Sequence, residues 1–209
     1  MKRRDLAVAL ASAGLLPSAR AQGGPVEGKH YARLGTPLPG TPGKIEVIEF
    51  FLYTCPACFA FDPQLEAWVH QLPPDVSFRR VPVGTQLMHK LHQRMFYALQ
   101  AMGALSPTVH AGIFNAFHRG GAQVTDEAEA VALVARLGVD SARFKQTLGS
   151  FAIQNKVNQG LKLAEQSGSD GVPTLIVAGR WRTGPGMAGQ QVLAVADFLV
   201  NQARGGKTS

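Results

Sequence analysis

The chain has 209 residues, of which 45% are hydrophobic and 17% charged, and its formal net charge is +7. This length fits one domain or one domain with an insertion, and the composition excludes an intrinsically disordered chain. No stretch approaches the roughly 18 consecutive apolar residues of a membrane-spanning helix. The sequence has no run of five like charges and no basic stripe with interleaved aromatic residues, so we expect no nucleic-acid partner.

The beginning of the chain predicts a signal for export. A basic start over 2–4 precedes an apolar run over 6–16, and the pattern at 19–21 is the small-x-small type that signal peptidase accepts. We therefore expect residues 1–21 to be a signal peptide, cleaved near Ala21. The paired arginines leave the Sec and twin-arginine routes both open. Four of the 21 basic residues and one of the 14 acidic residues leave with this segment, so the mature chain keeps a net charge of +4.

The first predicted elements are an arm, a strand and a helix. Residues 22–43 are rich in glycine and proline and predict an extended arm with a short strand over 31–34. The β-branched and aromatic stretch 45–53 predicts a strand that is covered on both faces, as in the middle of an α/β sheet. A helix is expected from Pro56, because proline suits the first turn of a helix, and it should end before Pro73.

The remaining elements complete an α/β pattern. A strand over 76–83 closes a right-handed unit of two parallel strands and a helix. Apolar residues at helical spacing then predict a series of helices, over 86–102, 107–118, 126–137 and 141–165. Two short strands over 174–178 and 181–183 follow, joined by a tight turn, and a helix over 190–202 ends the chain.

The chain has only two cysteines, Cys55 and Cys58. A bond between them closes a four-residue loop, which contributes only about 2 kcal/mol in the chain-entropy model, so a chemical role explains the pair better than a structural one. Cys55 is expected at the start of the helix, where free backbone N–H groups and the helix dipole favour a thiolate. Cys58 lies one turn further in. We expect Cys55 to exchange with the substrate and Cys58 to resolve the mixed disulfide.

A metal site is the main alternative for a C-x-x-C pair. A structural zinc site needs two further ligands, and the sequence has no other cysteine and no matching pair of histidines. His89 and His92 are three residues apart on a predicted helix, which is commoner for surface histidines than for ligands. His70, His110 and His118 are expected to be ordinary surface or half-buried residues. We therefore expect no metal and no cofactor.

Three segments together resemble the DsbA family of periplasmic disulfide oxidoreductases. Residues 47–58, with the sequence VIEFFLYTCPAC, resemble the family's active-site strand and helix start. Residues 28–31 resemble its N-terminal segment, and residues 171–174, with the sequence GVPT, resemble its cis-proline loop. The resemblance spans about 27–202, nearly the whole mature chain.

The resemblance implies a thioredoxin-like fold with an inserted helical domain. The thioredoxin-like domain would comprise 22–84 and 166–209, and the helical domain 85–165. Cys55 and Cys58 would form the redox-active disulfide, and the proline after Val172 would have a cis bond and lie beside Cys55. The catalytic and substrate-binding residues implied in this way are Cys55, Cys58, Glu49 and Pro173, with Pro56, Ala57 and Val172 contacting the substrate.

Two of these assignments have simpler alternatives. Glu49 matches the family's buried acid, which would have a raised pKa and could exchange the proton of Cys58; it could instead be a strand-end glutamate that reaches water. Pro173 could instead be a plain loop proline that starts a strand. One residue departs from the family, because Ala57 stands where the family commonly has histidine. We therefore predict a Cys55 thiol less acidic than in the family's strongest oxidants.

The resulting hypothesis is a periplasmic disulfide oxidase. It would introduce disulfides into reduced or unfolded exported proteins and be reoxidised by a DsbB-like membrane quinone reductase. The short segment before the first strong strand leaves no room for an added dimerisation domain, so we expect a monomer. An isomerase or reductase on the same fold, or a non-catalytic binding protein, stays open as an alternative.

Overall fold

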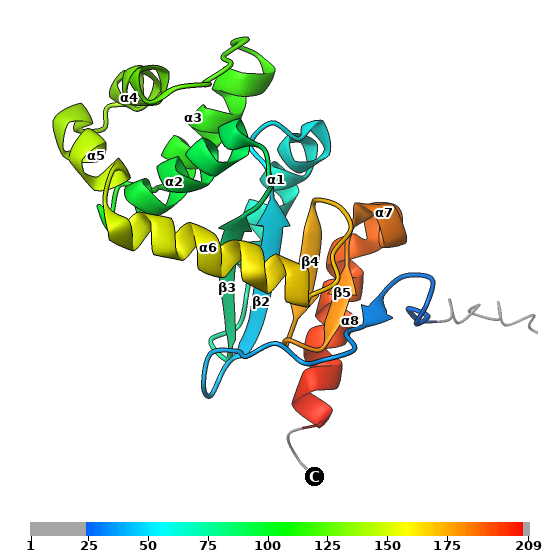
Figure 1. Ribbon diagram of the computed structural model, residues 1–209. Helices are drawn as coiled ribbons and strands as arrows, with labels where there is room; N and C mark the ends of the chain where they lie inside the picture. Colours follow the sequence, from blue (N-terminus) through cyan, green and yellow to red (C-terminus); the bar gives the residue numbers. More distant parts are fainter. Residues whose placement is uncertain (1–23, 207–209) are drawn as a thin grey trace, which may run out of the picture.

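The computed structural model describes residues 24–206, so the predicted signal peptide lies outside the described residues. Five strands form one mixed sheet in the order β1-β5-β4-β2-β3 (Figure 1). The strands are β1 (Ala32–Arg33), β2 (Ile45–Phe51), β3 (Val76–Pro82), β4 (Thr174–Val177) and β5 (Trp181–Thr183). Each agrees within a few residues with a strand expected from the sequence.

Strand β2 lies inside the sheet, between β4 and the edge strand β3, and every one of its residues is buried. It pairs in parallel with β3 through the crossover helix α1 (Pro56–Val69) and antiparallel with β4 on its other side. Three residues, 178–180, join β4 to β5. The Arg180 N–H bonds to the Val177 carbonyl oxygen, and the two central residues of this turn, Ala178 and Gly179, have φ angles of 52° and 63°. Positive φ at both central residues is the turn geometry that suits the twist of a hairpin.

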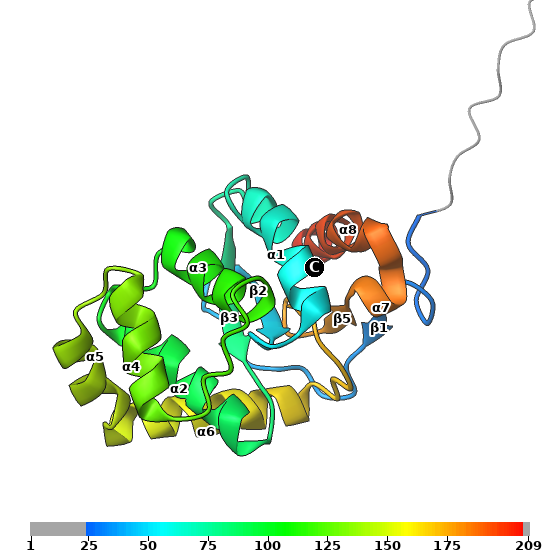
Figure 2. The same ribbon diagram turned by 90° about the horizontal axis from the view of Figure 1, so that it is seen from above.

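Helices cover both faces of the sheet. Seen from above, α1 and α8 (Val192–Gly205) lie on one face, and α6 (Phe151–Gln166) lies on the other (Figure 2). Strand β2 therefore has apolar neighbours on both faces, which explains why its sequence lacks a polar face. This three-layer arrangement is the thioredoxin-like fold that the resemblance implied.

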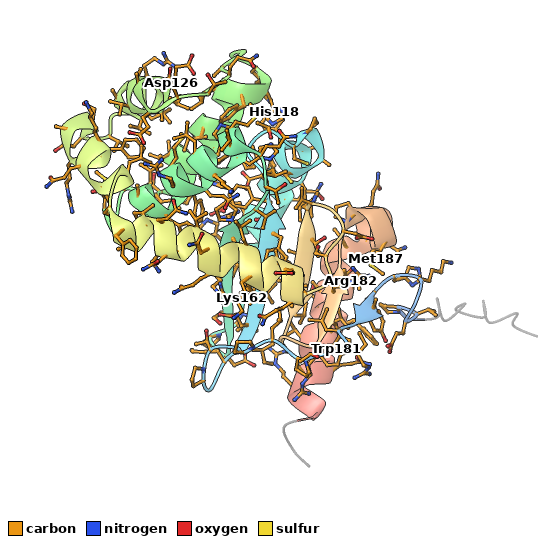
Figure 3. All side chains as sticks on the ribbon, in the orientation of Figure 1. His118, Asp126, Lys162, Trp181, Arg182 and Met187 are labelled. Atoms are coloured by element: carbon orange, nitrogen blue, oxygen red, sulfur yellow. The ribbon has the colours of Figure 1, made fainter. Side chains whose placement is uncertain are left out.

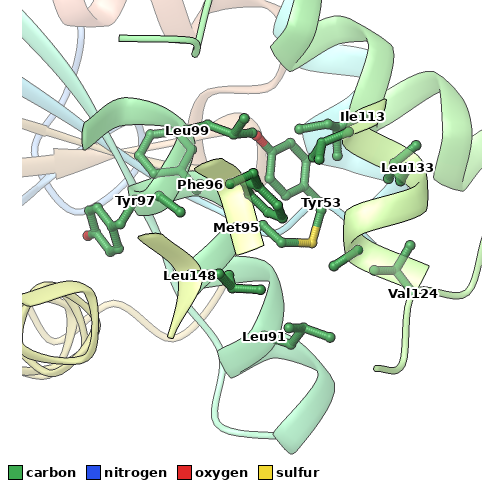
Figure 4. Close-up of a cluster of buried hydrophobic side chains, with 14 of the residues drawn as sticks. Tyr53, Leu91, Met95, Phe96, Tyr97, Leu99, Ile113, Val124, Leu133 and Leu148 are labelled. Carbon is green, nitrogen blue, oxygen red and sulfur yellow. The ribbon is translucent and has the colours of Figure 1, made fainter. Parts of the chain in front are cut away.

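The remaining helices form the insert between β3 and β4. They are α2 (Leu87–Ala101), α3 (Pro107–His118), α4 (Glu127–Arg136) and α5 (Ser141–Leu148), followed by α6. Their core is continuous with the end of β2, because Tyr53 packs in one cluster with Phe96 (Figure 4). Phe51 and Phe114 belong to the same cluster. The insert is thus bound to the segment that leads into the cysteines. The domain boundaries expected from the sequence remain predictions.

One helix assignment was wrong, and one short helix was missed. The stretch 141–165 was expected as one helix, but α5 ends at Leu148, and Ser150 is extended with ψ 146° before α6 begins. The break lets α5 pack on α2 and α4 while α6 crosses the sheet, and one straight helix could not make both sets of contacts. Near the C-terminus the sequence did not predict α7 (Pro185–Ala188), a single turn that precedes a 3₁₀ turn and α8.

Candidate active site

The two cysteines lie at the N-terminal end of α1. Strand β2 ends at Phe51, and Cys55 is the N-cap residue of the helix, with extended backbone angles and Pro56 in the first turn. The Cys55 sulfur accepts a hydrogen bond from the backbone N–H of Cys58, with a distance of 3.3 Å between Sγ and N. Cys55 is half-buried, whereas Cys58 has no exposed surface, and both are thiols in this structure.

The pKa values of the two thiols are shifted in opposite directions. The pKa of Cys55 is lowered to about 6, chiefly because the Cys58 thiol donates a hydrogen bond to its sulfur. Burial raises this pKa. The backbone N–H groups of Cys58 and Ala57 and the charge of His118 lower it further, so the net shift is downward. The pKa of Cys58 is raised, first by its hydrogen bond to Cys55 and then by burial. The geometry therefore makes Cys55 the thiolate and keeps Cys58 protonated.

The loop before β4 reaches the same place from a distant part of the chain. The bond between Val172 and Pro173 is cis, as expected from the resemblance. The carbonyl oxygen of Val172 accepts a hydrogen bond from the Cys55 thiol, with 3.7 Å between Sγ and O. The side chains of Pro56 and Ala57 are exposed beside this contact, while Pro173 is buried. Of the four residues expected to contact the substrate, Pro56 and Ala57 are therefore accessible, and both lie next to the Cys55 sulfur.

Glu49 is buried beneath the helix, with 2% of its surface exposed, so the alternative of a strand-end glutamate in water is wrong. Burial raises the pKa of Glu49 to about 8, even though the charge of Arg80 lowers it. The negative charge of Glu49 is among the effects that raise the pKa of Cys58. A carboxyl with a pKa near neutrality is suited to accept and return a proton at ordinary pH.

Arg80 is the partner of Glu49 and was not identified from the sequence. It faces Glu49 across the β2–β3 ladder, and its Nε lies 3.0 Å from Oε2 of that carboxylate. Its Nη2 also donates to Asp62 at 3.0 Å and to Glu66 at 2.9 Å, both on α1. One largely buried cation thus joins β2 and the edge strand β3 to the helix that carries the cysteines. Two adjacent arginines in the middle of a strand, Arg79 and Arg80, are the signal that could have revealed it.

The expectations for two histidines were wrong. His110 was expected to be an ordinary surface or half-buried residue, but only 3% of it is exposed. Its Nδ1 lies 2.8 Å from the Tyr53 hydroxyl oxygen, and its Nε2 lies 3.4 Å from Oδ1 of Asp62. Burial lowers the pKa of His110. His92 was expected at the surface, but it is 2% exposed because its Nε2 bonds to the carbonyl oxygen of Val124, at 2.8 Å. Each buried ring has a polar partner, which makes its burial tolerable.

His118 is half-buried as expected, but it lies at the candidate site. Its Nε2 donates a hydrogen bond to the carbonyl oxygen of Tyr53, at 2.8 Å. Its ring stacks on that of Phe59, with 4.7 Å between centroids and 6° between planes. Helix α3 thus contacts the segment on both sides of the cysteines. This contact joins residues far apart in sequence, so no local pattern could have indicated it.

A groove of about 740 Å³ lies on the sheet face that α6 covers. Apolar side chains of β2, the segment after β3, α6 and the cis-proline loop line it, among them Phe50, Leu52, Val83, Leu161 and Val172. Since Val172 also contacts Cys55, the groove begins beside the reactive sulfur. Among residues 24–206 no helix is long and apolar enough to cross a membrane, and no three His, Cys, Asp or Glu side chains are grouped to hold a metal ion.

The first prediction concerns the hydrogen bond between the two sulfurs. Cys58→Ala removes the donor that contributes most to the low pKa of Cys55, so that pKa should rise by about one unit. Cys58→Ser keeps a hydroxyl donor and should produce a smaller rise. The measurement is the ultraviolet absorbance of the thiolate during a pH titration. An equal Cys55 pKa in wild type and Cys58→Ala would contradict the assignment.

The second prediction concerns the pH dependence of stability. The raised pKa of Glu49, about 8, means that the folded protein holds this proton in a range where the unfolded chain has lost it. Raising the pH from about 5 to 7 therefore destabilises the folded state through Glu49, by on the order of 1 kcal/mol per pH unit. Glu49→Gln cannot ionise. Its stability relative to the wild type should therefore improve as the pH rises, as measured by urea unfolding of both reduced proteins; a difference independent of pH would refute the burial argument.

Comparison with known proteins agrees with this geometry. The family described as "DSBA-like thioredoxin domain" matches residues 85–196. The chain is 39% identical over 208 residues to the thiol:disulfide interchange protein DsbA of Pseudomonas syringae pv. tomato, covering 98% of this chain and 97% of the relative. It is 40% identical over 180 residues to the DsbA of Azotobacter vinelandii, covering 85% and 84% of the two chains.

Solved structures give the same result. The crystal structure of Pseudomonas aeruginosa DsbA superposes with a TM-score of 0.85 at 37% identity, covering 88% of this chain and 97% of that one. The DsbA oxidoreductase of Xylella fastidiosa superposes with a TM-score of 0.78 at 30% identity, covering 87% and 98%. These relatives and the geometry of the site lead to one conclusion. The chain belongs to the DsbA family of thioredoxin-fold thiol:disulfide interchange proteins.

Proposed function

We propose that the chain is a periplasmic disulfide oxidase that acts through Cys55 and Cys58. The observation that carries the proposal is the pairing of an accessible thiol whose pKa is lowered to about 6 with a fully buried thiol whose pKa is raised. Stabilising one thiolate favours the dithiol over the disulfide, and a disulfide that is readily reduced is an oxidant. Such a protein acts on reduced proteins as substrates.

The proposed reaction transfers two electrons from the substrate to the protein. A substrate thiolate attacks Cys55 Sγ in the Cys55–Cys58 disulfide, the S–S bond breaks, and Cys58 leaves with the electron pair and takes up a proton. A second substrate thiolate then attacks the substrate sulfur of the mixed disulfide and releases Cys55 as a thiolate. The substrate gains a disulfide, and the protein becomes the dithiol. The low pKa of Cys55 makes it a good leaving group in the second step.

Glu49 is proposed to exchange the proton of Cys58. It is buried under the same helix, its charge acts on the Cys58 thiol, and its own pKa of about 8 allows it to release and regain a proton near neutral pH. The hydrogen bond from Arg80 fixes the orientation of its carboxylate. The opposed effects of burial and of Arg80 hold the pKa in this useful range.

Pro56, Ala57, Val172 and Pro173 are proposed to contact the substrate chain. Pro56 and Ala57 are exposed next to the sulfur, and Val172 contributes both to the sulfur contact and to the lining of the groove. A groove floored by apolar strand residues suits the apolar side chains that an unfolded exported protein still exposes. A folded substrate would have buried those side chains.

The proposal includes a cycle and a compartment. A DsbB-like membrane quinone reductase would accept the two electrons of the dithiol and restore the disulfide. The signal-like segment 1–21, with proposed cleavage near Ala21, supports a periplasmic mature chain. We propose that this mature chain acts as a monomer. An isomerase or reductase on this fold is the second candidate, favoured if Ala57 leaves the disulfide too weakly oxidising.

The third prediction separates the candidates by activity. The oxidised protein should restore activity to reduced, denatured ribonuclease in the absence of another oxidant, and Cys55→Ala should abolish this activity because the disulfide cannot form. Equilibration with glutathione should show the protein mostly reduced in buffers that leave ordinary protein disulfides intact. A protein that reduces insulin readily but does not oxidise ribonuclease would instead be a reductase, and a wild type inactive in both assays would be a binding protein.

A further inference from the structure

The end of helix α3 lies against the start of α1, and His118 is one of the residues in this contact (Figure 3). Its Nε2 donates to the carbonyl oxygen of Tyr53, two residues before Cys55. Its ring is stacked face to face on Phe59, the residue after Cys58. The imidazole therefore contacts the chain on both sides of the C-x-x-C segment and is held in one orientation.

The C-x-x-C segment itself has no side chain that could carry a positive charge. Pro56 and Ala57 are exposed and neutral. The helix N-terminus and the Cys58 thiol remain as stabilising groups for the Cys55 thiolate. An additional cation must therefore come from another element of the fold.

We propose that His118 is a positioning residue for the disulfide-exchange reaction, and that helix α3 of the insert supplies through it the positive charge that Ala57 cannot supply. This inference deepens the proposed function and rests on it. The carbonyl of Tyr53 can only accept a hydrogen bond, so Nε2 is the donor and Nδ1 is left out of this contact. The stacked ring keeps that charge beside the segment that carries the nucleophile.

The electrostatic contribution agrees with this placement. The charge of His118 is among the causes that lower the pKa of Cys55, after the hydrogen bonds from Cys58 and Ala57, and it comes from outside the C-x-x-C segment. Arg119 is the other cation at this position, with its guanidinium 5.4 Å from the centre of the Phe59 ring. Arg119 is exposed and follows the end of α3, so water screens its charge more strongly.

The inference also gives the insert a chemical role. His110, two turns earlier on α3, lies 2.8 Å from the Tyr53 hydroxyl, so the same helix is attached to both the side chain and the backbone of Tyr53. These two hydrogen bonds fix the position of helix α3 relative to the segment before Cys55. The redox centre is then shared between the thioredoxin-like part, which supplies the sulfurs, and the inserted helices, which supply the charge.

The fourth prediction tests His118 by substitution. His118→Gln removes the charge but keeps an amide donor for the Tyr53 carbonyl, and His118→Phe removes the charge but keeps the stacked ring. Both should raise the Cys55 pKa by between about 0.3 and 1 unit in a thiolate titration. In equilibrium with glutathione each variant should be correspondingly less oxidising. Circular dichroism of each variant checks that it is folded.

Three matched variants make the test specific. His70→Gln changes a histidine at the opposite end of α1 and should leave the Cys55 pKa unchanged. Arg119→Gln should raise it less than His118→Gln does. Ala57→His in the His118→Gln background should lower it again, because it restores a cation within the segment.

A Cys55 pKa that is unchanged in folded His118→Gln and His118→Phe overturns the inference, and so does a larger rise in Arg119→Gln. The titration needs only the reduced protein, so its result does not depend on oxidase activity. If the wild type fails the ribonuclease assay while His118→Gln still raises the Cys55 pKa, the proposed function fails and the electrostatic role of His118 stands.

Discussion

The hydrogen bonding of the Cys55 sulfur at the start of α1 is the interaction on which the candidate site depends. The sulfur takes the position of a helix N-cap and accepts from the N–H of Cys58 at 3.3 Å, so it satisfies a backbone donor at the helix end and favours the thiolate there. Strand β2 fixes this position, because it is buried over its whole length and ends only four residues earlier, at Phe51. The buried strand thus fixes the position of the Cys55 sulfur at the start of α1.

Below the helix, the same strand carries a buried acid that would be unstable without its partner. Arg80 joins Glu49 of β2 to Asp62 and Glu66 of α1, with all three N–O distances between 2.9 and 3.0 Å. One cation faces three carboxyls, and the raised pKa of Glu49 relieves part of that excess by keeping this acid protonated near neutral pH. The burial that stabilises the sheet thereby produces a titratable group under the buried thiol.

Local patterns in the sequence predicted the parts of the site that are local. The apolar stretch of β2, the proline after Cys55 and the resemblance around Val172 placed both cysteines and the cis bond. The partners supplied by tertiary contacts were missed: Arg80 lies across a strand ladder, and His118 comes from the insert, 63 positions beyond Cys55. The break between α5 and α6 was missed because apolar residues continue at helical spacing through it. The two helices are separate because α5 packs on α2 and α4, whereas α6 crosses the sheet.

The central claim is that the folded structure stabilises the thiolate of Cys55 and hence the reduced protein. The most direct test compares the free energies of unfolding of the oxidised and reduced forms in urea at neutral pH. In the unfolded chain the disulfide closes only a short loop, which by itself would stabilise the oxidised fold by about 2 kcal/mol. We predict the opposite order, with the reduced form more stable, because a disulfide that oxidises others must be weakened by folding. An oxidised form that is as stable as the reduced one, or more stable, would contradict this account.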